Sequence, residues 1–237
     1  MLYFTPYDVL VIPALLLALW AQFKVKSAYA KYSRISTRSG LTGADVARLI
    51  LRDSQIPLVM SDNRPEGSCG LEAIPGQLTD HYDPRDRTLR LSEDIYHGSS
   101  IAALGIAAHE VGHAVQHARL YLPMSLRGMM YPLSSIGSTL AFPLFFVGMI
   151  FPATQFLMQV GIWLFTFAVL FTVVTLPVEF NASRRALAAL ANGGYLDAEE
   201  LRGAKKVLTA AAMTYVASAA MAAMQLLRMV LIARGRN

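Results

Sequence analysis

The sequence HEVGH at residues 109–113 holds two histidines and a glutamate at a spacing that can do chemistry. On a helix, residues four apart share one face, so the imidazoles of His109 and His113 can bind one zinc ion at about 2.0–2.1 Å. Glu110 can then take a proton from a zinc-activated water and pass it to the leaving amine. Gly112 is tolerated in a helix and leaves room beside the metal. The spacing therefore predicts a zinc-dependent hydrolytic site with Glu110 as general base.

A further histidine, His117, follows on the same predicted helix. Positions eight residues apart lie about 12 Å apart along a helix axis, so His117 and His109 cannot share a zinc ion. The continuation HAVQHARLY also lacks the HxxGxxH pattern of the metzincins. We expect His117 to lie at the surface or to contact the ligand residues from outside.

A long uncharged stretch separates this motif from the next acidic residue. No residue between Gly128 and Val178 carries a charge. At about 1.5 Å per residue, this length exceeds one crossing of a bilayer and suffices for two. The sequence PATQ at 152–155 is the natural turn, and we expect spans near 134–151 and 156–177. Such a hairpin leaves from and returns to the same side of the membrane.

The third metal ligand must come from outside the motif, and Glu179 is the first acidic residue after Glu110. Gluzincin-type sites take a glutamate from a later helix, and VEFNASRRALAAL has helical periodicity. Two membrane crossings return Glu179 to the side that holds His109 and His113, whereas one crossing would strand it. Topology and chemistry both indicate Glu179 as the third ligand. The alternative is an interfacial glutamate that caps a helix N-terminus.

The residues before the uncharged stretch predict a small α+β region that positions the motif. IAALGIAAHEVGHAVQHA is apolar on its back face, and we expect a helix over about 99–119. Thr42 precedes an amphipathic helix in GADVARLILR. IPLVM, LEAIPGQLTDHYD and TLRLS are short and β-rich, and DPRDR between the last two predicts a hairpin turn.

The composition indicates a membrane protein. Hydrophobic residues make up 54% of the chain and charged residues only 16%, against roughly 25% charged residues in soluble domains. The net charge is +5, but no Lys/Arg-rich run with interleaved aromatics occurs, so no nucleic-acid partner is expected. The positive residues flank hydrophobic stretches, as the positive-inside rule predicts for cytoplasmic segments. The single cysteine, Cys69, cannot form an internal disulfide.

Two further hydrophobic stretches lie near the ends of the chain. Residues 9–23 are apolar, and the basic segment KVKSAYAKYSRISTR that follows places residue 24 onward in the cytoplasm. Residues 207–233 are long enough to span and rich in Ala and Ser, which let transmembrane helices approach closely. Because Arg228 interrupts this stretch, a buried or interfacial helix is the alternative.

These features predict a mainly α, multi-pass helical membrane protein with a small cytoplasmic α+β catalytic part of zincin type. The expected segments are an N-terminal transmembrane helix (1–23), a cytoplasmic catalytic region (24–133), a transmembrane hairpin (134–178), a third-ligand helix with a cytoplasmic segment (179–206), and a C-terminal hydrophobic helix (207–237).

Several motifs together resemble those of the YugP-like family of bacterial membrane zinc metallopeptidases. They are AQFKVKSAYAKYS, LTGADVAR, LTDHYDPRDRTLRLS, AAHEVGHAVQHA and EFNASRRAL, and they cover nearly the whole chain. The family is similar in plan to the HtpX-like and CAAX-prenyl membrane proteases, in which a hydrophobic hairpin also separates H-E-x-x-H from a glutamate ligand. The resemblance implies zinc bound by His109, His113 and Glu179, with Glu110 as general base.

The sequence departs from the HtpX-like pattern E-x-x-A-D around the third ligand. Ser183 stands where that pattern has its aspartate, which puts a carboxylate–histidine hydrogen bond there in doubt. Ser183 or Asn181 could supply a neutral hydrogen bond instead.

The segment QLTDHYDPRDRTLRLS could form a substrate-binding edge, because metallopeptidases commonly hold a peptide as an added strand. His81, Tyr82 or Arg85 could contact the substrate or the oxyanion. The plainer interpretation is a structural hairpin with a solvated turn.

The function expected from these observations is that of a zinc metalloendopeptidase in the bacterial inner membrane. It would hydrolyse peptides or membrane proteins at the cytoplasmic surface of the lipid bilayer; the sequence does not indicate an oligomeric state. One alternative is a membrane scaffold or adaptor with a structural zinc site, which would need no base at Glu110. A metal transporter is disfavoured, because no acid or histidine lies inside the first three expected spans.

Overall fold

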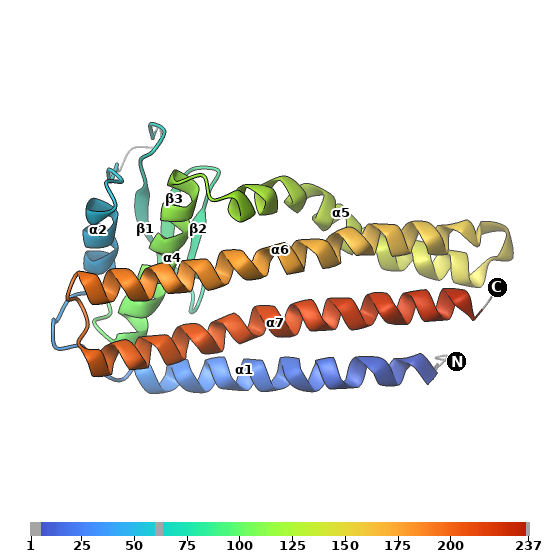
Figure 1. Cartoon of the computed structure of the whole chain (residues 1–237), viewed down its shortest axis with the longest axis horizontal. Coiled ribbons are helices and arrows are strands. Elements are labelled where there is room, and N and C mark those ends of the chain that lie inside the picture. Colours follow the sequence, from blue (N-terminus) through green and yellow to red (C-terminus); the bar gives the residue numbers. More distant parts are fainter. Residues whose placement is uncertain (1–5, 60–63, 236–237) are drawn as a thin grey trace. The chain divides into compact units, whose positions relative to one another are not determined.

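The computed structural model of the chain describes residues 6–59 and 64–235. The first five residues of the expected segment 1–23, Met60 of IPLVM and the last two residues lie outside them. Four helices in the described part are long and apolar enough to cross a membrane, and Figure 1 shows their course. They are α1 (Ile12–Tyr32, preceded by the 3-10 helix Pro6–Val11), α5 (Leu122–Ile150), α6 (Phe156–Asn192) and α7 (Ala198–Arg234). The chain is thus a mainly α membrane protein, as predicted.

The chain forms two compact units. One, here called the hydrophobic unit, consists of Met1–Phe23, Ser125–Pro177 and Met213–Asn237. The other, here called the site unit, consists of Lys24–Met124 and Val178–Ala212. Several helices continue from one unit into the other, because polar residues sustain a helix as well as apolar ones do.

Helix bounds in the structure differ from the expected spans, because the helices continue into polar residues beyond the apolar stretches. α5 begins at Leu122 rather than near 134, and α7 begins at Ala198 rather than at 207. α6 runs without a break from the expected span 156–177 through Glu179. Hydropathy indicates where a membrane could begin and end, but not where a helix does.

A three-stranded sheet lies in the site unit, with β1 (Gly70–Ile74), β2 (His81–Asp83) and β3 (Thr88–Ser92) in the order β1-β3-β2. β2 and β3 form the predicted antiparallel hairpin. β1 pairs with β3 in parallel, an arrangement that the sequence did not indicate. The strand expected in IPLVM was wrong for its described residues, where Leu58 makes only an isolated bridge to Cys69.

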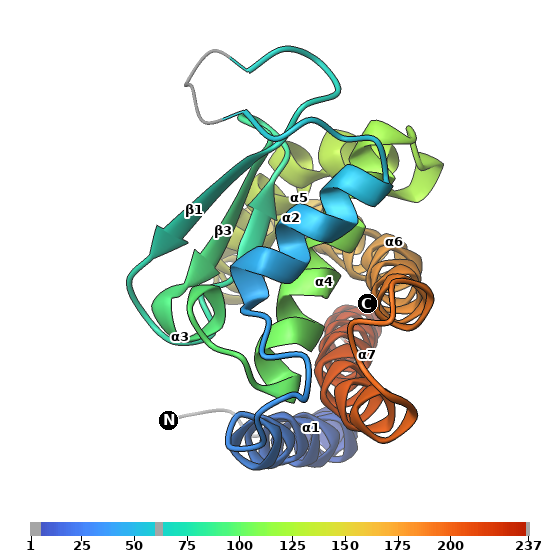
Figure 2. The same cartoon turned by 90° about the vertical axis from the view of Figure 1, so that its left-hand side faces the viewer.

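Helix α2 (Gly43–Asp53) begins at the predicted cap. The Thr42 hydroxyl accepts from the Asp45 backbone N–H, and the Asp45 carboxylate accepts from the Thr42 N–H, both at 3.1 Å. Such a reciprocal pair satisfies two of the free N–H groups at a helix start. α2 and α4 lie beside the sheet in Figure 2.

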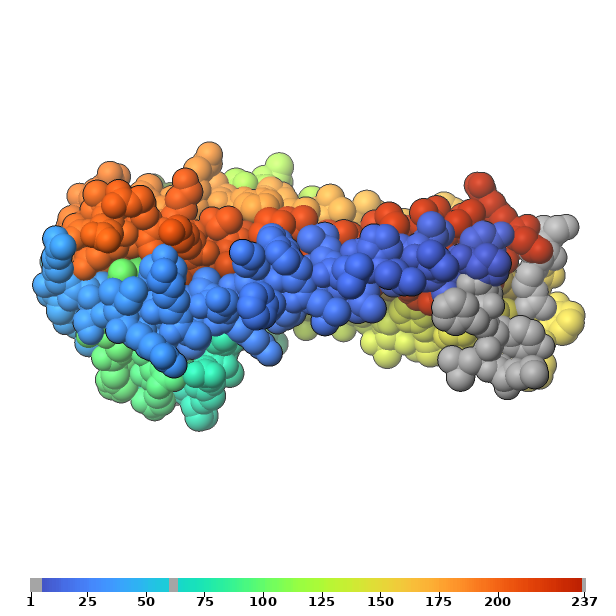
Figure 3. All heavy atoms as spheres, turned by 90° about the horizontal axis from the view of Figure 1, so that it is seen from below, coloured from blue at the N-terminus to red at the C-terminus, as the bar shows by residue number. Residues whose placement is uncertain are grey.

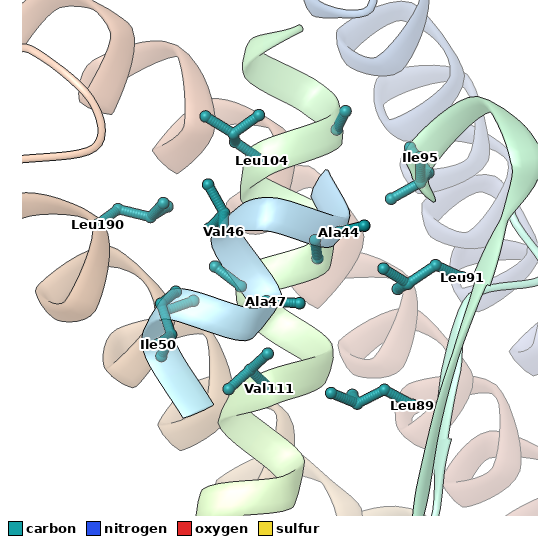
Figure 4. Packing of buried hydrophobic residues seen from close by; sticks show 14 of the residues in the cluster. Ala44, Val46, Ala47, Ile50, Leu89, Leu91, Ile95, Leu104, Val111 and Leu190 are labelled. Atoms are coloured by element: carbon teal, nitrogen blue, oxygen red, sulfur yellow. The ribbon is translucent and has the colours of Figure 1, made fainter. Parts of the chain in front are cut away.

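The predicted motif helix is α4 (Ile101–Ala118), and its first turn is capped by Ser100. The short helix α3 (Glu93–Tyr96), which was not expected, leads into it. Figure 4 shows the core between these elements, to which α2 contributes Val46 and Ile50, α4 contributes Val111, β3 contributes Leu89 and α6 contributes Leu190. Each of these side chains is at most 4% exposed, so α4 is fixed along its apolar face.

The hydrophobic unit contains the predicted hairpin of α5 and α6. A 3-10 helix, Pro152–Thr154, makes the turn expected at 152–155. A Cβ added at Gly161 would lie 2.6 Å from the carbonyl oxygen of Ala141, so glycine here allows close helix packing. In the same unit Arg228 pairs with Asp8, which accounts for the charge that interrupts the C-terminal stretch.

Candidate metal centre

Helices α4 and α6 bring together three side chains that could hold a metal ion: His109, His113 and Glu179. One ligand atom from each residue lies within 4.8 Å of the other two. The Glu179 Oε2 atom lies 3.3 Å from His109 Nε2 and 3.6 Å from His113 Nε2. These three residues are the predicted ligand set, from segments separated by the whole hydrophobic hairpin.

Gly112 is the residue that lets the two helices meet. A Cβ at this position would lie 2.7 Å from the carbonyl oxygen of Ala182 on α6, closer than real contacts allow. The glycine therefore faces the backbone of α6, rather than leaving room beside the metal as expected from the sequence. The close approach places Glu179 and Ser183, on either side of Ala182, next to the histidines of α4.

Gln116 fixes the orientation of the His113 ring, a role that the sequence analysis missed. The Gln116 side-chain NH₂ donates to the Val178 carbonyl at 2.8 Å and to Asn181 Oδ1 at 3.0 Å. Its Oε1 therefore points to His113 Nδ1, at 3.0 Å. Because an amide oxygen only accepts, Nδ1 carries a hydrogen, and Nε2 is the ring nitrogen that faces Glu179. The signal in the sequence was an amide side chain on the otherwise apolar motif helix, about one turn after His113. The structure shows this side chain fully buried.

Ser183 holds the other histidine. Its hydroxyl lies 3.1 Å from His109 Nδ1, which leaves Nε2 directed at Glu179. Among the described residues, Asn181 makes no hydrogen bond to a histidine; its Oδ1 accepts from Gln116 and, at 2.7 Å, from Arg185 Nε. The stretch after Glu179 thus supplies neutral hydrogen bonds in place of the aspartate of the HtpX-like pattern. Hydrogen bonds at Nδ1 are the usual support of metal-binding histidines.

The donor set suits a metal cation. Side-chain exposure is 14% for His109, 8% for His113 and 3% for Glu179. Burial lowers the pKa of His113, but its hydrogen bond to Glu179 and the charges of Glu110 and Glu179 outweigh burial, so the pKa lies above its ordinary value. Negative charge that favours a proton on this ring also favours a metal ion. Two imidazoles and a carboxylate are a frequent zinc ligand set.

Two further acidic side chains of the site unit do not belong to this cluster. Glu110 is 9% exposed on α4. Asp80 precedes β2 and accepts hydrogen bonds from the Ser92 backbone N–H and hydroxyl at 2.7 and 3.0 Å. Burial raises the pKa of Asp80, and the charge of Glu110 raises it further. The sequence analysis did not single out Asp80.

The remaining candidate residues lie around the hairpin rather than at the ligand cluster. His117 Nδ1 is 2.8 Å from the Tyr82 hydroxyl, and this contact joins α4 to β2. His81 contacts the Thr79 carbonyl, and Arg85 pairs with Asp83. The structure thus separates His117 from the metal ligands, while His81 and Arg85 make hydrogen bonds within the hairpin segment.

Comparison with known proteins fits this centre. The family described as "Putative neutral zinc metallopeptidase" matches residues 7–234, and the chain belongs to this family of zinc peptidases. The chain is also 46% identical, over 223 residues and 94% of each protein, to "Putative membrane protease YugP" of Bacillus subtilis (strain 168). No solved structure matches the chain.

Proposed function

We propose that this protein is a zinc metalloendopeptidase of gluzincin type that cleaves peptide bonds at the cytoplasmic surface of the bacterial inner membrane. The observation that carries the proposal is the convergence of His109, His113 and Glu179 from two helices, with both histidine Nδ1 atoms already engaged. A zinc ion held there would polarise the scissile carbonyl and make a water molecule acidic enough to attack it.

Glu110 is the proposed general base. It follows His109 directly on α4, and its charge is one of the factors that raise the pKa of His113. It is not one of the three residues of the ligand cluster, so a role in proton transfer does not compete with metal binding. In this role Glu110 takes the proton of the attacking water and delivers it to the leaving nitrogen. A purely structural metal site would have no use for such a base.

The substrate is proposed to bind along β2. This strand pairs with β3 on one side, and within the described residues no strand covers its other side. An extended peptide can add to such an edge through backbone hydrogen bonds. Glu179 directly follows the uncharged stretch, so the proposed site would lie close to the membrane surface. The substrates would therefore be membrane proteins or peptides at that surface.

The test is Glu110→Gln in the full-length protein, incubated with inner-membrane vesicles that lack the endogenous enzyme. We expect zinc content to remain near one per chain, while new protein N-termini, counted by mass spectrometry, fall to the level without enzyme. Glu199→Gln, an exposed position, is the matched control and should cleave as the wild type does. Cleavage retained by Glu110→Gln would refute the mechanism.

The same measurement distinguishes a peptidase from a membrane scaffold with a structural zinc site. A scaffold would bind zinc, and even its wild-type form would yield no new N-termini.

The proposed side of the membrane is tested by reporter fusions after Gly40 and Gly194, two glycines with positive φ in turns. Both fusions should report a cytoplasmic location.

A further inference from the structure

A cavity of about 280 Å³ lies in the site unit, beside the C-terminal part of α4. α4 contributes Ala114, His117 and Ala118 to its lining, and β2 contributes Tyr82. None of the described lining residues belongs to α1 or α7, whose end and beginning Figure 3 shows side by side at the surface, in blue and orange. Because α4 carries two of the proposed metal ligands and β2 is the proposed substrate edge, the cavity borders both elements of the proposed site.

The cavity begins about one helical turn beyond a metal ligand. His117 follows His113 by four residues, so the two side chains lie on the same face of α4, about 6 Å apart along the helix axis. Each residue of an extended peptide spans about 3.3 Å. A peptide with its scissile bond at the metal centre would therefore reach the cavity with a residue about two or three positions from that bond.

Arg87, between β2 and β3, also lines this cavity, and part of its guanidinium lacks a partner. Its Nη2 donates to the Arg64 carbonyl at 2.9 Å. Its Nε is buried and has no hydrogen-bond partner among the described residues. No acidic side chain in the described part of the chain forms an ion pair with Arg87. A buried donor without an acceptor costs free energy, so an anionic ligand at this side chain would be stabilising.

The backbone of Arg87 adopts a conformation that arginine rarely takes. Its φ is 56°, in the left-handed region that favours glycine, asparagine and aspartate. The Gly70 N–H donates to the Arg87 carbonyl at 2.8 Å and helps to hold this conformation. A glycine at position 87 would relieve the strain but would remove the guanidinium from the cavity. Strained residues of this kind occur frequently at binding sites, which agrees with a ligand-binding role for this side chain.

The other titratable groups of the lining, apart from Glu66, are neutral near pH 7. Burial raises the pKa of the Cys69 thiol to about 12 and also raises the pKa of the Tyr82 hydroxyl. Burial and the charge of Arg87 lower the pKa of His117. Glu66 is exposed and, in the part of the chain that the structure describes, forms no ion pair with Arg87. Among the lining groups that are not exposed, Arg87 is therefore the charged one.

We propose that this cavity binds a carboxylate of the peptide substrate, and that Arg87 is the residue that recognises it. A guanidinium is always charged, and its planar array of donors matches the geometry of a carboxylate. Ala114 and Ala118 would pack against the carbon atoms that carry this group. The carboxylate belongs either to an acidic side chain or to the C-terminus of the peptide. This proposal rests on the proposed peptidase function, since that function supplies the peptide.

The test measures peptide binding to the full-length, zinc-loaded Glu110→Gln protein in detergent, so that no cleavage is needed. Three fluorescent peptides share one apolar sequence and differ only at the last residue, which is an amidated glutamine, an amidated glutamate, or a glutamine with a free C-terminus. In anisotropy titrations, at least one carboxylate peptide should bind at least tenfold more tightly than the amidated glutamine peptide. The peptide that binds more tightly identifies the source of the carboxylate.

Arg87→Gln, added to the Glu110→Gln protein, should remove this preference, because a hydrogen bond between charged groups contributes roughly a factor of ten or more. Arg87→Lys should restore part of it, since lysine keeps the charge but not the planar array of donors. Arg119→Gln is the matched control. Arg119 also donates to a backbone carbonyl, that of Ser54 at 3.4 Å, and it does not line the cavity. This control should keep the full preference.

Equal binding of the three peptides by the Glu110→Gln protein would overturn the proposal, and this comparison needs no change at Arg87. An undiminished preference in Arg87→Gln, with its fold checked by thermal unfolding, would overturn it as well. Equal loss in Arg87→Gln and Arg119→Gln would replace it by general attraction to the basic surface. A carboxylate preference in a protein whose wild type releases no new N-termini would refute the peptidase and leave the carboxylate site standing.

Discussion

The two units of this chain satisfy their buried polar groups in opposite ways. In the hydrophobic unit, threonine hydroxyls donate to carbonyls of their own helix, as Thr166 does to Ile162 and Thr175 to Phe171. In the site unit, Gln116 and Ser183 instead join α4 to α6 across more than 60 residues of sequence. Local bonds make each helix self-sufficient where water is absent. Long-range bonds set the position of one helix against another, which a metal site requires.

The largest expected effect concerns the site unit, where long-range contacts assemble the proposed metal centre. Glu179→Ala removes the only carboxylate of the ligand cluster, and zinc in the purified protein should fall from about one per chain to near zero. Elemental analysis measures this directly. Glu199→Ala is the control, and unchanged stoichiometry in Glu179→Ala would assign the third ligand to another residue.

The hydrophobic unit also contains a long-range polar contact, between Asp8 and Arg228. Arg228→Leu removes the guanidinium from a pair whose side chains are 27% and 13% exposed, and should cost about 3 kcal/mol of stability. Zinc content should stay unchanged, because the pair lies outside the site unit. The double variant Asp8→Leu/Arg228→Leu should recover most of the loss in thermal unfolding. Loss of zinc in the single variant would show that the units depend on each other.

The close approach of α4 and α6 can be broken without touching a polar group. Gly112→Ala forces a methyl group against the Ala182 carbonyl, and should cost about 1–3 kcal/mol and weaken zinc binding. At Gly105, on the same helix, an added Cβ would meet Ala204 Cβ at an ordinary 3.4 Å. Gly105→Ala should therefore retain zinc and stability. Equal behaviour of the two variants in a zinc competition assay would contradict the role given to Gly112.

The smallest effects compare one hydrogen bond from each unit. Gln116→Ala should weaken zinc binding about 10–100-fold, because the His113 ring loses its support. Thr175→Val removes a buried hydroxyl that bonds only within α6, and should change neither zinc affinity nor thermal stability by more than about 1 kcal/mol. A large zinc defect in Thr175→Val would argue against the local character of that bond.

The sequence predicted those features of the structure that a short local pattern specifies. The Thr42 cap, the β2–β3 hairpin, the 152–155 turn and the HEVGH helix each follow from a short pattern, and the structure confirms them. The convergence of Glu179 with the histidines followed from counting membrane crossings. No short pattern predicts the parallel pairing of β1 with β3, because the residues of a single strand do not specify its partner strand. Gln116 is not a metal ligand and so is not part of the HEVGH pattern, although a glutamine on an apolar helix needs a polar partner once it is buried.

The separation of the ligands along the chain also has a consequence for biosynthesis. Glu179 follows His113 by 66 residues, and at about 5–20 residues per second the ribosome needs roughly 3–13 s to add them. During that time a nascent chain has both histidines and no carboxylate to complete the proposed site. The intervening residues are those that enter the bilayer. The proposed peptidase would therefore be complete only after its hydrophobic hairpin has been made, and the nascent chain would not cleave other proteins before then.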